Sequence, residues 1–374
     1  MKPRVLAYAD KMFTPSESFI HRSYKAFDKL EPVFIGHEQR GPTPDGMRAI
    51  KLGELHGAVG EAGFKQFGIV SDKLKARLLA EKPVAIHAHF GKSGAYALPL
   101  ARALNLPLVT TYYGGDATKT SNTADNPFRA YNRRRTRLWR ECALILPCSD
   151  FIRRELEARG CPPDKMVVHH NTADPDRFAP GEKTRLILFA GRWTEKKGID
   201  TLIAALARLG PKLDGWRVRL VGDGELKAAL VARLETAGVS VELPGWVPAD
   251  DMPAQFAQAM IHCVPSKRAA SGDAEGLPLV CIEAMLSSCA LLATRHAGIT
   301  ECVRDGKTGY LVDEGDDEAL AERLGRMIAD PEATLRMGEA GRDFALSSFN
   351  LITQSKRLED HLLRVAGEAG TLPA

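Results

Sequence analysis

The sequence predicts an α/β protein built from two Rossmann-like domains of similar size, each a parallel sheet covered by helices. Short apolar runs alternate with helical patterns along the whole chain, which is typical of parallel sheets. A polar, proline-rich segment without periodicity interrupts the alternation at residues 174–182, after which the alternation begins again. A length of 374 residues is also comfortable for two domains and long for one.

The expected elements divide into two series. In the first half the strand candidates are residues 4–9, 32–36, 85–90, 108–112, 144–148 and 166–169, and the helix candidates are 19–27, 93–104 and 127–142. In the second half the strand candidates are 185–190, 217–221, 239–243, 260–265, 290–294 and 309–312, and the helix candidates are 199–209, 225–237, 250–259 and a short one around Thr300. We therefore expect an N-terminal domain over 1–176, a C-terminal domain over 177–350, and a C-terminal helix in 351–374 that can pack back on the first domain.

Composition limits the class of protein. A hydrophobic content of 44% and a charged content of 26% describe an ordinary soluble globular protein, and a net charge of +4 does not indicate a nucleic-acid partner. The seven cysteines show no metal-ligand spacing and are expected to be reduced core residues. We find no pattern of a signal peptide or a transmembrane helix, so a cytoplasmic location is expected.

Two glutamates eight positions apart are the most informative feature. Glu275 and Glu283 lie on either side of Gly-Leu-Pro and an apolar run, and Pro278 suits the first position of a helix. The free N–H groups of the first helical turn would then lie between two carboxylates. Such a site can hold a phosphate on its amides and sugar hydroxyls on its carboxylates, as a nucleotide sugar requires. The alternative is a pair of solvated surface charges.

Two glycine-containing turns follow predicted strands of the second half. In the turn 191–198, Arg192 and Lys197 can both reach one diphosphate, although the turn can equally be a basic loop exposed to solvent. In the turn 221–224 the third glycine of a dinucleotide fingerprint is absent. Gly222 therefore indicates a tight turn that a ligand or another backbone approaches closely.

The order and spacing of these motifs resemble those of the family-4 retaining glycosyltransferases. These enzymes have the GT-B fold, with two Rossmann-like domains and the donor bound to the second. The pair Glu275 and Glu283 matches the family's E-x7-E motif, and the run 296–301 continues the match. In the first half, the phrases 16–20, 87–91 and 110–118 resemble members that build exopolysaccharide or lipid-linked glycans.

The resemblance implies roles for the donor side. Arg192 and Lys197 would neutralise the donor diphosphate, and Glu275 would hold the donor sugar, so these three form the expected catalytic set. The remaining expected donor-binding residues are Gly276 and Leu277 through their amides, Glu283 on the ribose, and Gly222 and Val247 near the nucleotide. No metal and no cofactor are expected, because fixed cations and helix-terminal amides can stabilise the leaving phosphate.

The resemblance also implies an acceptor side in the first domain, formed by Glu17, Ser18, His89, Tyr113 and Asp116. Ser18 is in addition a suitable N-cap for the helix expected at 19–27. Many members carry histidine at the position of Tyr113, and a phenol is a poorer proton shuttle near neutral pH. Asp116 can accept a hydrogen bond from the acceptor or cap the following turn. His89 can face the cleft or be satisfied structurally.

An arginine-rich segment with interleaved aromatic residues suggests contact with anionic lipid headgroups or a polyphosphate-linked acceptor. Its arginines are Arg129, Arg133, Arg134, Arg135, Arg137 and Arg140. The alternative is an ordinary amphipathic helix.

The expected function is that of a metal-independent, retaining hexosyltransferase of bacterial surface-glycan synthesis. It would use a UDP-sugar in preference to a GDP-sugar, would act on a lipid-linked or polysaccharide acceptor, and would lie in the cytoplasm or on the inner face of the membrane. The alternatives are a non-catalytic nucleotide-sugar-binding protein of the same fold and a sugar-nucleotide epimerase or glycogen-synthase-like enzyme. A dehydrogenase is disfavoured because neither half carries the full glycine fingerprint.

Overall fold

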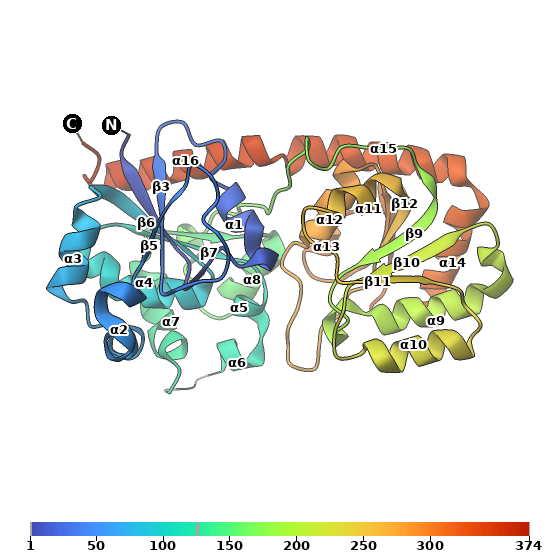
Figure 1. Ribbon diagram of the computed structural model, residues 1–374, viewed down its shortest axis with the longest axis horizontal. Helices are drawn as coiled ribbons and strands as arrows, with labels where there is room; N and C mark the ends of the chain where they lie inside the picture. Colours follow the sequence, from blue (N-terminus) through green and yellow to red (C-terminus); the bar gives the residue numbers. More distant parts are fainter. Residues whose placement is uncertain (1, 125, 127, 374) are drawn as a thin grey trace. The chain divides into compact units, whose positions relative to one another are not determined.

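Two compact units make up the computed structural model, which describes residues 2–124, 126 and 128–373 (Figure 1). The first unit comprises Met1–His170 together with Leu351–Ala374, and the second comprises Asn171–Asn350. The division falls at residues 170 and 171, whereas the sequence placed its boundary at 176 and 177. Each unit contains a six-stranded parallel sheet, so the predicted α/β class is confirmed.

The sheet of the first unit has the order β5-β3-β1-β6-β7-β8. Its strands are β1 Arg4–Tyr8, β3 Glu31–Gly36, β5 Arg48–Lys51, β6 Pro83–His89, β7 Leu108–Tyr112 and β8 Leu144–Pro147, and a separate pair is formed by β2 Lys11–Met12 and β4 Glu38–Gln39. The α-helices are α1 Ser18–Arg22, α2 Gly53–Ala62, α3 Asp72–Leu79, α4 Gly91–Leu104, α5 Gly115–Thr118, α6 Thr120–Thr123, α7 Ala130–Glu141, α8 Asp150–Glu157 and α16 Leu351–Glu368. Short helical turns are η1 Pro15–Glu17, η2 Gly63–Phe67 and η3 Pro163–Lys165.

The second sheet has the order β11-β10-β9-β12-β13-β14. Its strands are β9 Thr184–Ala190, β10 Arg217–Val221, β11 Glu242–Gly245, β12 Ala259–Val264, β13 Ala290–Thr294 and β14 Gly309–Val312. The helices are η4 Glu195–Lys197, α9 Ile199–Leu209, η5 Gly210–Leu213, α10 Lys227–Thr236, α11 Met252–Gln258, α12 Leu279–Leu286, α13 Ile299–Cys302, α14 Asp317–Ala329 and α15 Pro331–Ser348.

Both sheets reverse their strand order at the centre. Counted along the chain within each sheet, the spatial order is 3-2-1-4-5-6, the order of the Rossmann fold. The reversal falls between β1 and β6 in the first unit and between β9 and β12 in the second. In such sheets ligands bind beyond the carboxyl ends of the strands at this reversal, so the topology marks one candidate position in each unit.

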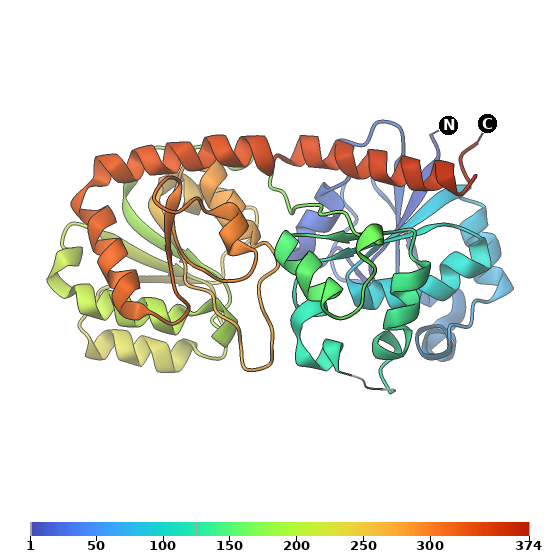
Figure 2. The same cartoon turned by 180° about the vertical axis from the view of Figure 1, so that it is seen from behind.

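The C-terminal helix α16 is part of the first unit's core (Figure 2). Leu358 and Leu362 are buried in the same apolar cluster as Val5 and Phe34 of the sheet. The buried carboxylate of Glu359 accepts hydrogen bonds from the backbone N–H groups of residues 28, 29 and 30 at 2.7 to 3.1 Å. This helix therefore closes the first unit from the far end of the chain.

Several expected elements differ from the structure. The helix expected at 19–27 ends at Arg22, and Ser18 is its first helical residue instead of its N-cap, a position that Glu17 occupies without a side-chain hydrogen bond. The strand expected at 166–169 is reduced to a single bridge from Met166 to Ile145. β11 begins three residues later than expected and ends two residues later, at Glu242–Gly245. The helix expected at 127–142 is α7, and residue 127 lies outside the described residues.

The helix after Glu275 begins one residue later than predicted. Pro278 has φ −65° and ψ 124°, so it is the N-cap residue, and α12 starts at Leu279. The reason is that its extended ψ angle is not helical, although its φ angle is. Glu275 still lies in the preceding loop and Glu283 inside the helix, as the sequence predicted.

Gly198 is the N-cap residue of α9, and its backbone conformation leads to a testable prediction. It has φ +60°, and a Cβ atom there would lie 1.8 Å from the carbonyl oxygen of Pro265. Gly238 has nearly the same φ, +64°, but has open space around its Cβ position. We expect Gly238→Ala to cost about 1 kcal/mol of stability for its backbone conformation. Gly198→Ala should cost at least about 3 kcal/mol, because it adds a backbone clash. Urea denaturation of both variants measures the difference, and equal losses would contradict the packing described.

Candidate active site

The predicted donor residues gather at the carboxyl-end edge of the second sheet. Lys197 follows β9 through the turn η4, and Glu275 lies in the long loop that follows β12. These are the two strands between which the strand order reverses. Ser266, two residues beyond β12, is buried, and its hydroxyl lacks a hydrogen-bond partner among the described residues. The arrangement leaves a buried polar group at the position where Rossmann sheets bind ligands.

Glu275 and Lys197 form a buried ion pair at the centre of this edge. Lys197 Nζ lies 2.8 Å from Glu275 Oε1, and the two side chains are 18% and 9% exposed. Lys196 Nζ lies farther away, 3.9 Å from Glu275 Oε2, and contacts Asp273 at 3.4 Å. Burial acts to raise the pKa of Glu275, but Lys197 and Lys196 outweigh it and lower the pKa to about 2. Glu275 is therefore a carboxylate at neutral pH, able to accept hydrogen bonds from hydroxyl groups.

His296 and Glu314 hold the loop of Glu275 in place. The backbone N–H of Glu275 donates to His296 Nε2 at 3.1 Å, so that nitrogen carries no proton. His296 Nδ1 then donates to Glu314 Oε1 at 2.6 Å, and Glu314 also accepts from the backbone N–H of Arg268 at 2.8 Å. These contacts connect the segments after β13 and β14 to the loop after β12. The sequence did not indicate such roles for Lys196, His296 or Glu314. The match of the run 296–301 was the one available signal.

The other predicted donor residues occupy different environments. Arg192 is exposed, in the turn directly after β9. Glu283 is half-buried inside α12, and Gly276 and Leu277 are buried in the loop before it. Val247 is half-buried, two residues beyond β11.

Gly222 is required for a close approach of two backbones. Its φ is +125°, and a Cβ atom there would lie 1.9 Å from the carbonyl oxygen of Gly191. Its N–H donates to the carbonyl of Gly245 at 2.7 Å. Of the two explanations for this glycine, the structure therefore shows the approach of a neighbouring backbone.

Two of the predicted acceptor-side residues, His89 and Tyr113, are in direct contact in the first unit. His89, at the end of β6, lies with Nδ1 2.7 Å from the hydroxyl of Tyr113. Tyr113 is half-buried; its ring packs edge-on against Phe19 with 5.0 Å between centroids and lies tilted against Phe90 with 4.9 Å between centroids. Burial raises the pKa of Tyr113 well above its ordinary value, with Cys148 and Asp116 adding to the effect, so the phenol keeps its proton.

A continuous chain of hydrogen bonds extends from Tyr113 into the core. The hydroxyl of Tyr24 lies 2.8 Å from His89 Nε2 and 2.6 Å from His87 Nδ1, and His87 Nε2 lies 2.7 Å from the hydroxyl of Thr111. Each neutral imidazole has one donor and one acceptor nitrogen. If every group in the chain donates once in the same direction, Tyr113 either donates to His89 or accepts from it. The phenol is thus linked to a set of neutral groups through which its donor or acceptor state can reverse.

The structure predicts that the imidazoles of His87 and His89 are neutral, and this prediction is testable. Burial lowers the pKa of His89 to about 3 and that of His87 well below its ordinary value. Between pH 6.5 and 3, His89 binds a proton in the unfolded protein but not in the folded protein. The folded state therefore loses stability as the pH falls through this range. We expect imidazole ¹⁵N NMR spectra at pH 5 to show neutral rings for both residues, and a protonated His89 would contradict the structure.

Asp116 organises the turn instead of standing free. Its carboxylate accepts from the backbone N–H groups of Tyr113, Gly114 and Gly91 at 2.9 to 3.1 Å. The Gly91 bond also ties this turn to the start of α4. Of the two expected roles, the structure shows the capping one. Glu17 and Ser18 are both half-buried at the junction of η1 and α1.

Further structural observations bear on the chemistry of the whole chain. All seven cysteines are buried and free, which confirms that they are core residues. Among the described residues, no cluster of three His, Cys, Asp or Glu side chains could hold a metal ion. Within the same residues, no helix combines the length and the apolar character that crossing a bilayer requires.

Two Rossmann-type units, each with the strand order 3-2-1-4-5-6, make up the architecture of the GT-B glycosyltransferases. The family comparison agrees. The model described as "Glycosyl transferases group 1" matches residues 171–344, and the model described as "Glycosyltransferase Family 4" matches residues 16–177. The chain belongs to this family of group 1, family 4 glycosyltransferases.

Individual proteins show the same relationship. WcaL of Salmonella typhimurium (strain LT2), whose name assigns it to colanic acid biosynthesis as a glycosyltransferase, is 34% identical over 247 residues, covering 63% of this chain and 59% of its own. The GDP-mannose-dependent alpha-(1-6)-phosphatidylinositol monomannoside mannosyltransferase of Mycolicibacterium smegmatis is 33% identical, covering 50% and 54%. The match thus spans less than two thirds of both relatives. The crystal structure of Anabaena Alr3699/HepE with UDP and glucose has a TM-score of 0.77 and 18% identity, covering 97% of this chain and all of that one, which confirms the GT-B fold.

Proposed function

We propose that the protein is a retaining hexosyltransferase that moves a sugar from a nucleotide-sugar donor to a lipid-linked or polysaccharide acceptor in bacterial surface-glycan synthesis. The observation that carries the proposal is the buried pair of Glu275 and Lys197 at the strand reversal of the second sheet. The relative named for colanic acid biosynthesis supports a polysaccharide acceptor, and the phosphatidylinositol mannoside enzyme supports a lipid-linked one.

The donor would bind with its diphosphate on the basic turn after β9. Lys197 has three N–H donors, so it can keep its contact with Glu275 and still bind a phosphate oxygen. Arg192, exposed in the same turn, would supply the second cation, and Glu283 would bind the ribose. Charge that develops on the leaving diphosphate would meet these fixed cations and the amides before α12, which can stabilise it without a metal.

Glu275 would bind the sugar itself. Because its pKa is lowered to about 2, it cannot serve as a proton donor near neutral pH and acts instead as a hydrogen-bond acceptor for sugar hydroxyls. Front-side attack by the acceptor hydroxyl would then retain the anomeric configuration. Tyr113, fixed by His89, would contact the acceptor.

The nucleotide base is proposed to be uridine. The structural relative with bound UDP supports this proposal, whereas the mannosyltransferase relative uses GDP-mannose. The protein is proposed to work in the cytoplasm at the inner face of the membrane, where a lipid-linked acceptor would be presented.

Product stereochemistry tests the proposal. The protein is incubated with UDP-glucose or GDP-mannose and with a polyprenyl-linked glycan acceptor, and the new linkage is read by ¹H NMR. We expect release of one nucleoside diphosphate and a product with the donor's α configuration, both lost in Glu275→Gln. An inverted product would overturn the retaining mechanism. Binding of donor without any transfer would favour the non-catalytic alternative.

A further inference from the structure

The arginines of α7 do not form a uniform charged face. Arg133 donates to the carbonyl of Gln66 at 2.7 Å, and Arg135 donates to the carbonyls of Asn122 and Thr123 at 2.9 and 2.8 Å. These arginines therefore tie the helix to neighbouring segments. Since carbonyl groups carry no net charge, the positive charge of α7 remains.

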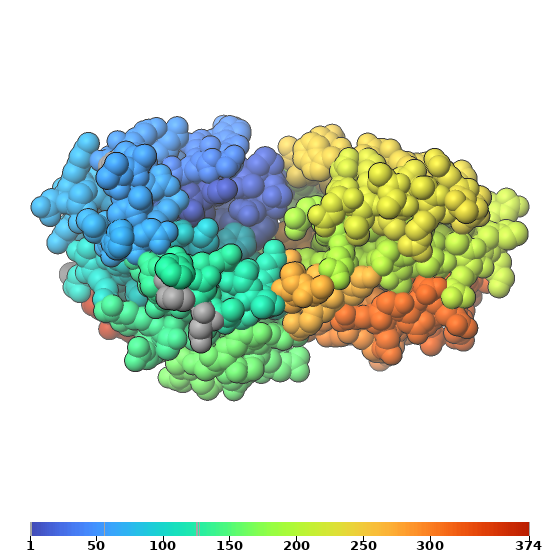
Figure 3. Space-filling view, turned by 90° about the horizontal axis from the view of Figure 1, so that it is seen from below, coloured from blue at the N-terminus to red at the C-terminus, as the bar shows by residue number. Residues whose placement is uncertain are grey.

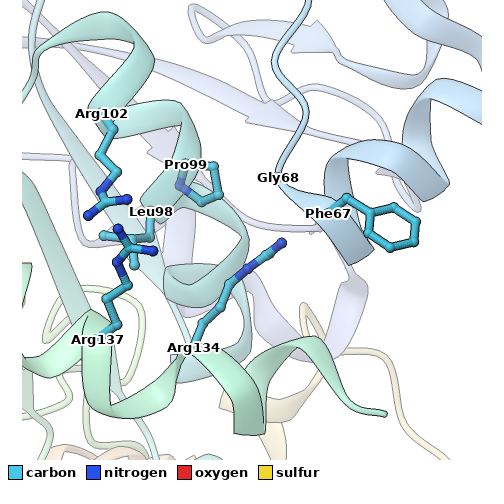
Figure 4. A pocket seen from close by; sticks show the side chains of 7 residues that line it. All are labelled: Phe67, Gly68, Leu98, Pro99, Arg102, Arg134 and Arg137. Carbon is cyan, nitrogen blue, oxygen red and sulfur yellow. The ribbon is translucent and has the colours of Figure 1, made fainter. Parts of the chain in front are cut away.

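A hollow beside α7 concentrates this charge. It has a volume of about 270 Å³ and is lined by Phe67, Gly68, Leu98, Pro99, Arg102, Arg134 and Arg137 (Figure 4). The figure shows the guanidinium groups of Arg102 and Arg137 turned toward each other beside Leu98, whereas Arg134, from the same helix as Arg137, extends toward Gly68 and Phe67. The volume lies just below the roughly 300–1,000 Å³ of pockets that enclose a drug-sized ligand, so a small headgroup suits it better.

The hollow carries an excess of positive charge. Glu141 accepts from Arg102 at 2.6 and 2.7 Å and from Arg137 at 2.8 Å, so one carboxylate serves two guanidinium groups. Arg134 donates instead to the carbonyls of Lys65, Gln66 and Ala95 at 3.0 to 3.3 Å. Burial, together with the charges of Arg133 and Arg137, lowers the pKa of Arg134. An anion bound beside these three arginines would balance the excess charge.

Exposed apolar side chains lie at the rim. The side chain of Phe67 is 80% exposed and that of Ile69, two residues later, is 61% exposed. The Phe67 ring points away from the arginines (Figure 4). Phe128, just before α7, is 87% exposed. Viewed from below, the blue segment around α2 and the green segment of α7 lie side by side on one face of the first unit (Figure 3).

We propose that Arg102, Arg134 and Arg137 bind the phosphate of an anionic phospholipid, with Phe67 and Ile69 inserted between neighbouring lipids. Basic residues close to exposed aromatic and aliphatic side chains are the pattern of a membrane-surface contact. A soluble phosphate would use the arginines but would leave the exposed apolar rim without a partner. The site rests on the proposed function for its purpose, which is to bring the protein to lipid-linked acceptors.

Vesicle cosedimentation tests this site independently of glycosyl transfer. The probes are phosphatidylcholine vesicles with and without phosphatidylglycerol. We expect binding to the anionic vesicles alone, weakened by salt. Arg137→Gln should reduce the affinity for anionic vesicles about fivefold, and the double variant Arg134→Gln/Arg137→Gln should reduce it about 25-fold. Phe67→Ser should also reduce it. Arg154→Gln is the matched control. Arg154 pairs with Asp150 four residues away in its own helix, α8, just as Arg137 pairs with Glu141 four residues away in α7.

A variant that is expected to bind more tightly is also needed, because misfolding would not increase specific binding. Glu141→Gln removes the carboxylate of the hollow and should increase affinity for the anionic vesicles by about fivefold. Equal binding to neutral vesicles, or equal effects of Arg137→Gln and Arg154→Gln, would overturn the proposal. A thermal shift by inorganic phosphate or by transfer RNA that is lost in the arginine variants, without vesicle binding, would also overturn it and assign the hollow to a soluble anion or to RNA. Vesicle binding in a protein without transferase activity would overturn the proposed function and leave the lipid site standing.

Discussion

Lys197→Ala is expected to destabilise the protein by about 3–5 kcal/mol and to abolish donor binding, because it leaves the buried carboxylate of Glu275 without its nearest partner. Lys196→Ala is the matched control. Its ammonium is 3.9 Å from the same carboxylate and is shared with Asp273, so its removal should cost much less. Urea denaturation and nucleotide titration of the two variants measure both effects.

The pH dependence of the Lys197→Ala penalty identifies its origin. The pKa of Glu275 is lowered from 4.5 to about 2, so the stabilisation is complete above pH 4.5 and is lost as the pH falls toward 2. The difference in unfolding free energy between wild type and Lys197→Ala should therefore shrink over this range. A penalty that is constant with pH, or one equal to that of Lys196→Ala, would show that the ion pair is not its source.

Tyr113→His is expected to lower turnover, although it restores the residue that many family members carry. The phenol of Tyr113 reaches His89 at 2.7 Å, and an imidazole at the same position is shorter and would leave His89 Nδ1 unpaired. It would also leave space between Phe19 and Phe90. Turnover and unfolding free energy of the variant measure the two consequences, with an expected stability loss of about 1–3 kcal/mol.

Tyr8→Phe is the control for this experiment. The hydroxyl of Tyr8 lies 3.2 Å from His37 Nδ1 within the same unit, so its removal also disturbs a buried tyrosine–histidine pair. It should cost stability and leave turnover intact. A large gain of turnover in Tyr113→His would instead indicate that tyrosine has impaired an ancestral site.

The sequence was informative where a local pattern determines structure. Buried central strands are marked by continuous apolar runs, such as the five residues from Leu186 to Ala190 that form most of β9. The strand β5, Arg48–Lys51, was missed because it lies at the sheet edge and buries one of its four residues fully. Asp316, the N-cap residue of α14, shows such a local pattern, because its carboxylate accepts from the N–H of Ala319 at 2.8 Å, three residues away.

The site was predicted in its sequence-local part and missed in its long-range part. The spacing of Glu275, Glu283 and the basic turn is visible in the chain itself. The contacts of Glu275 with His296 and of Tyr24 with His87 and His89 join residues 21 to 65 positions apart. They depend on which strands lie next to one another, and neither periodicity nor motif spacing carries that information.

The expected roles of the α7 arginines also changed once their contacts were known. The sequence showed six positive charges, and the structure shows that Arg133, Arg134 and Arg135 all donate to backbone carbonyls, which do not neutralise them. The arginines that line the hollow are Arg102, Arg134 and Arg137, and Arg102 comes from α4, which the arginine-rich segment does not include.

The measurement that tests the donor site most directly is a thermal-shift titration of the purified protein with UDP, GDP and ADP and their sugar conjugates. A ligand that binds the native state alone raises the melting temperature by mass action, by an amount that grows with its concentration. We expect a clear rise with one nucleotide, UDP being favoured, and its loss in Arg192→Ala and in Glu283→Ala. No rise with any nucleotide at millimolar concentration would contradict the assignment of the second sheet's edge as a nucleotide-sugar site.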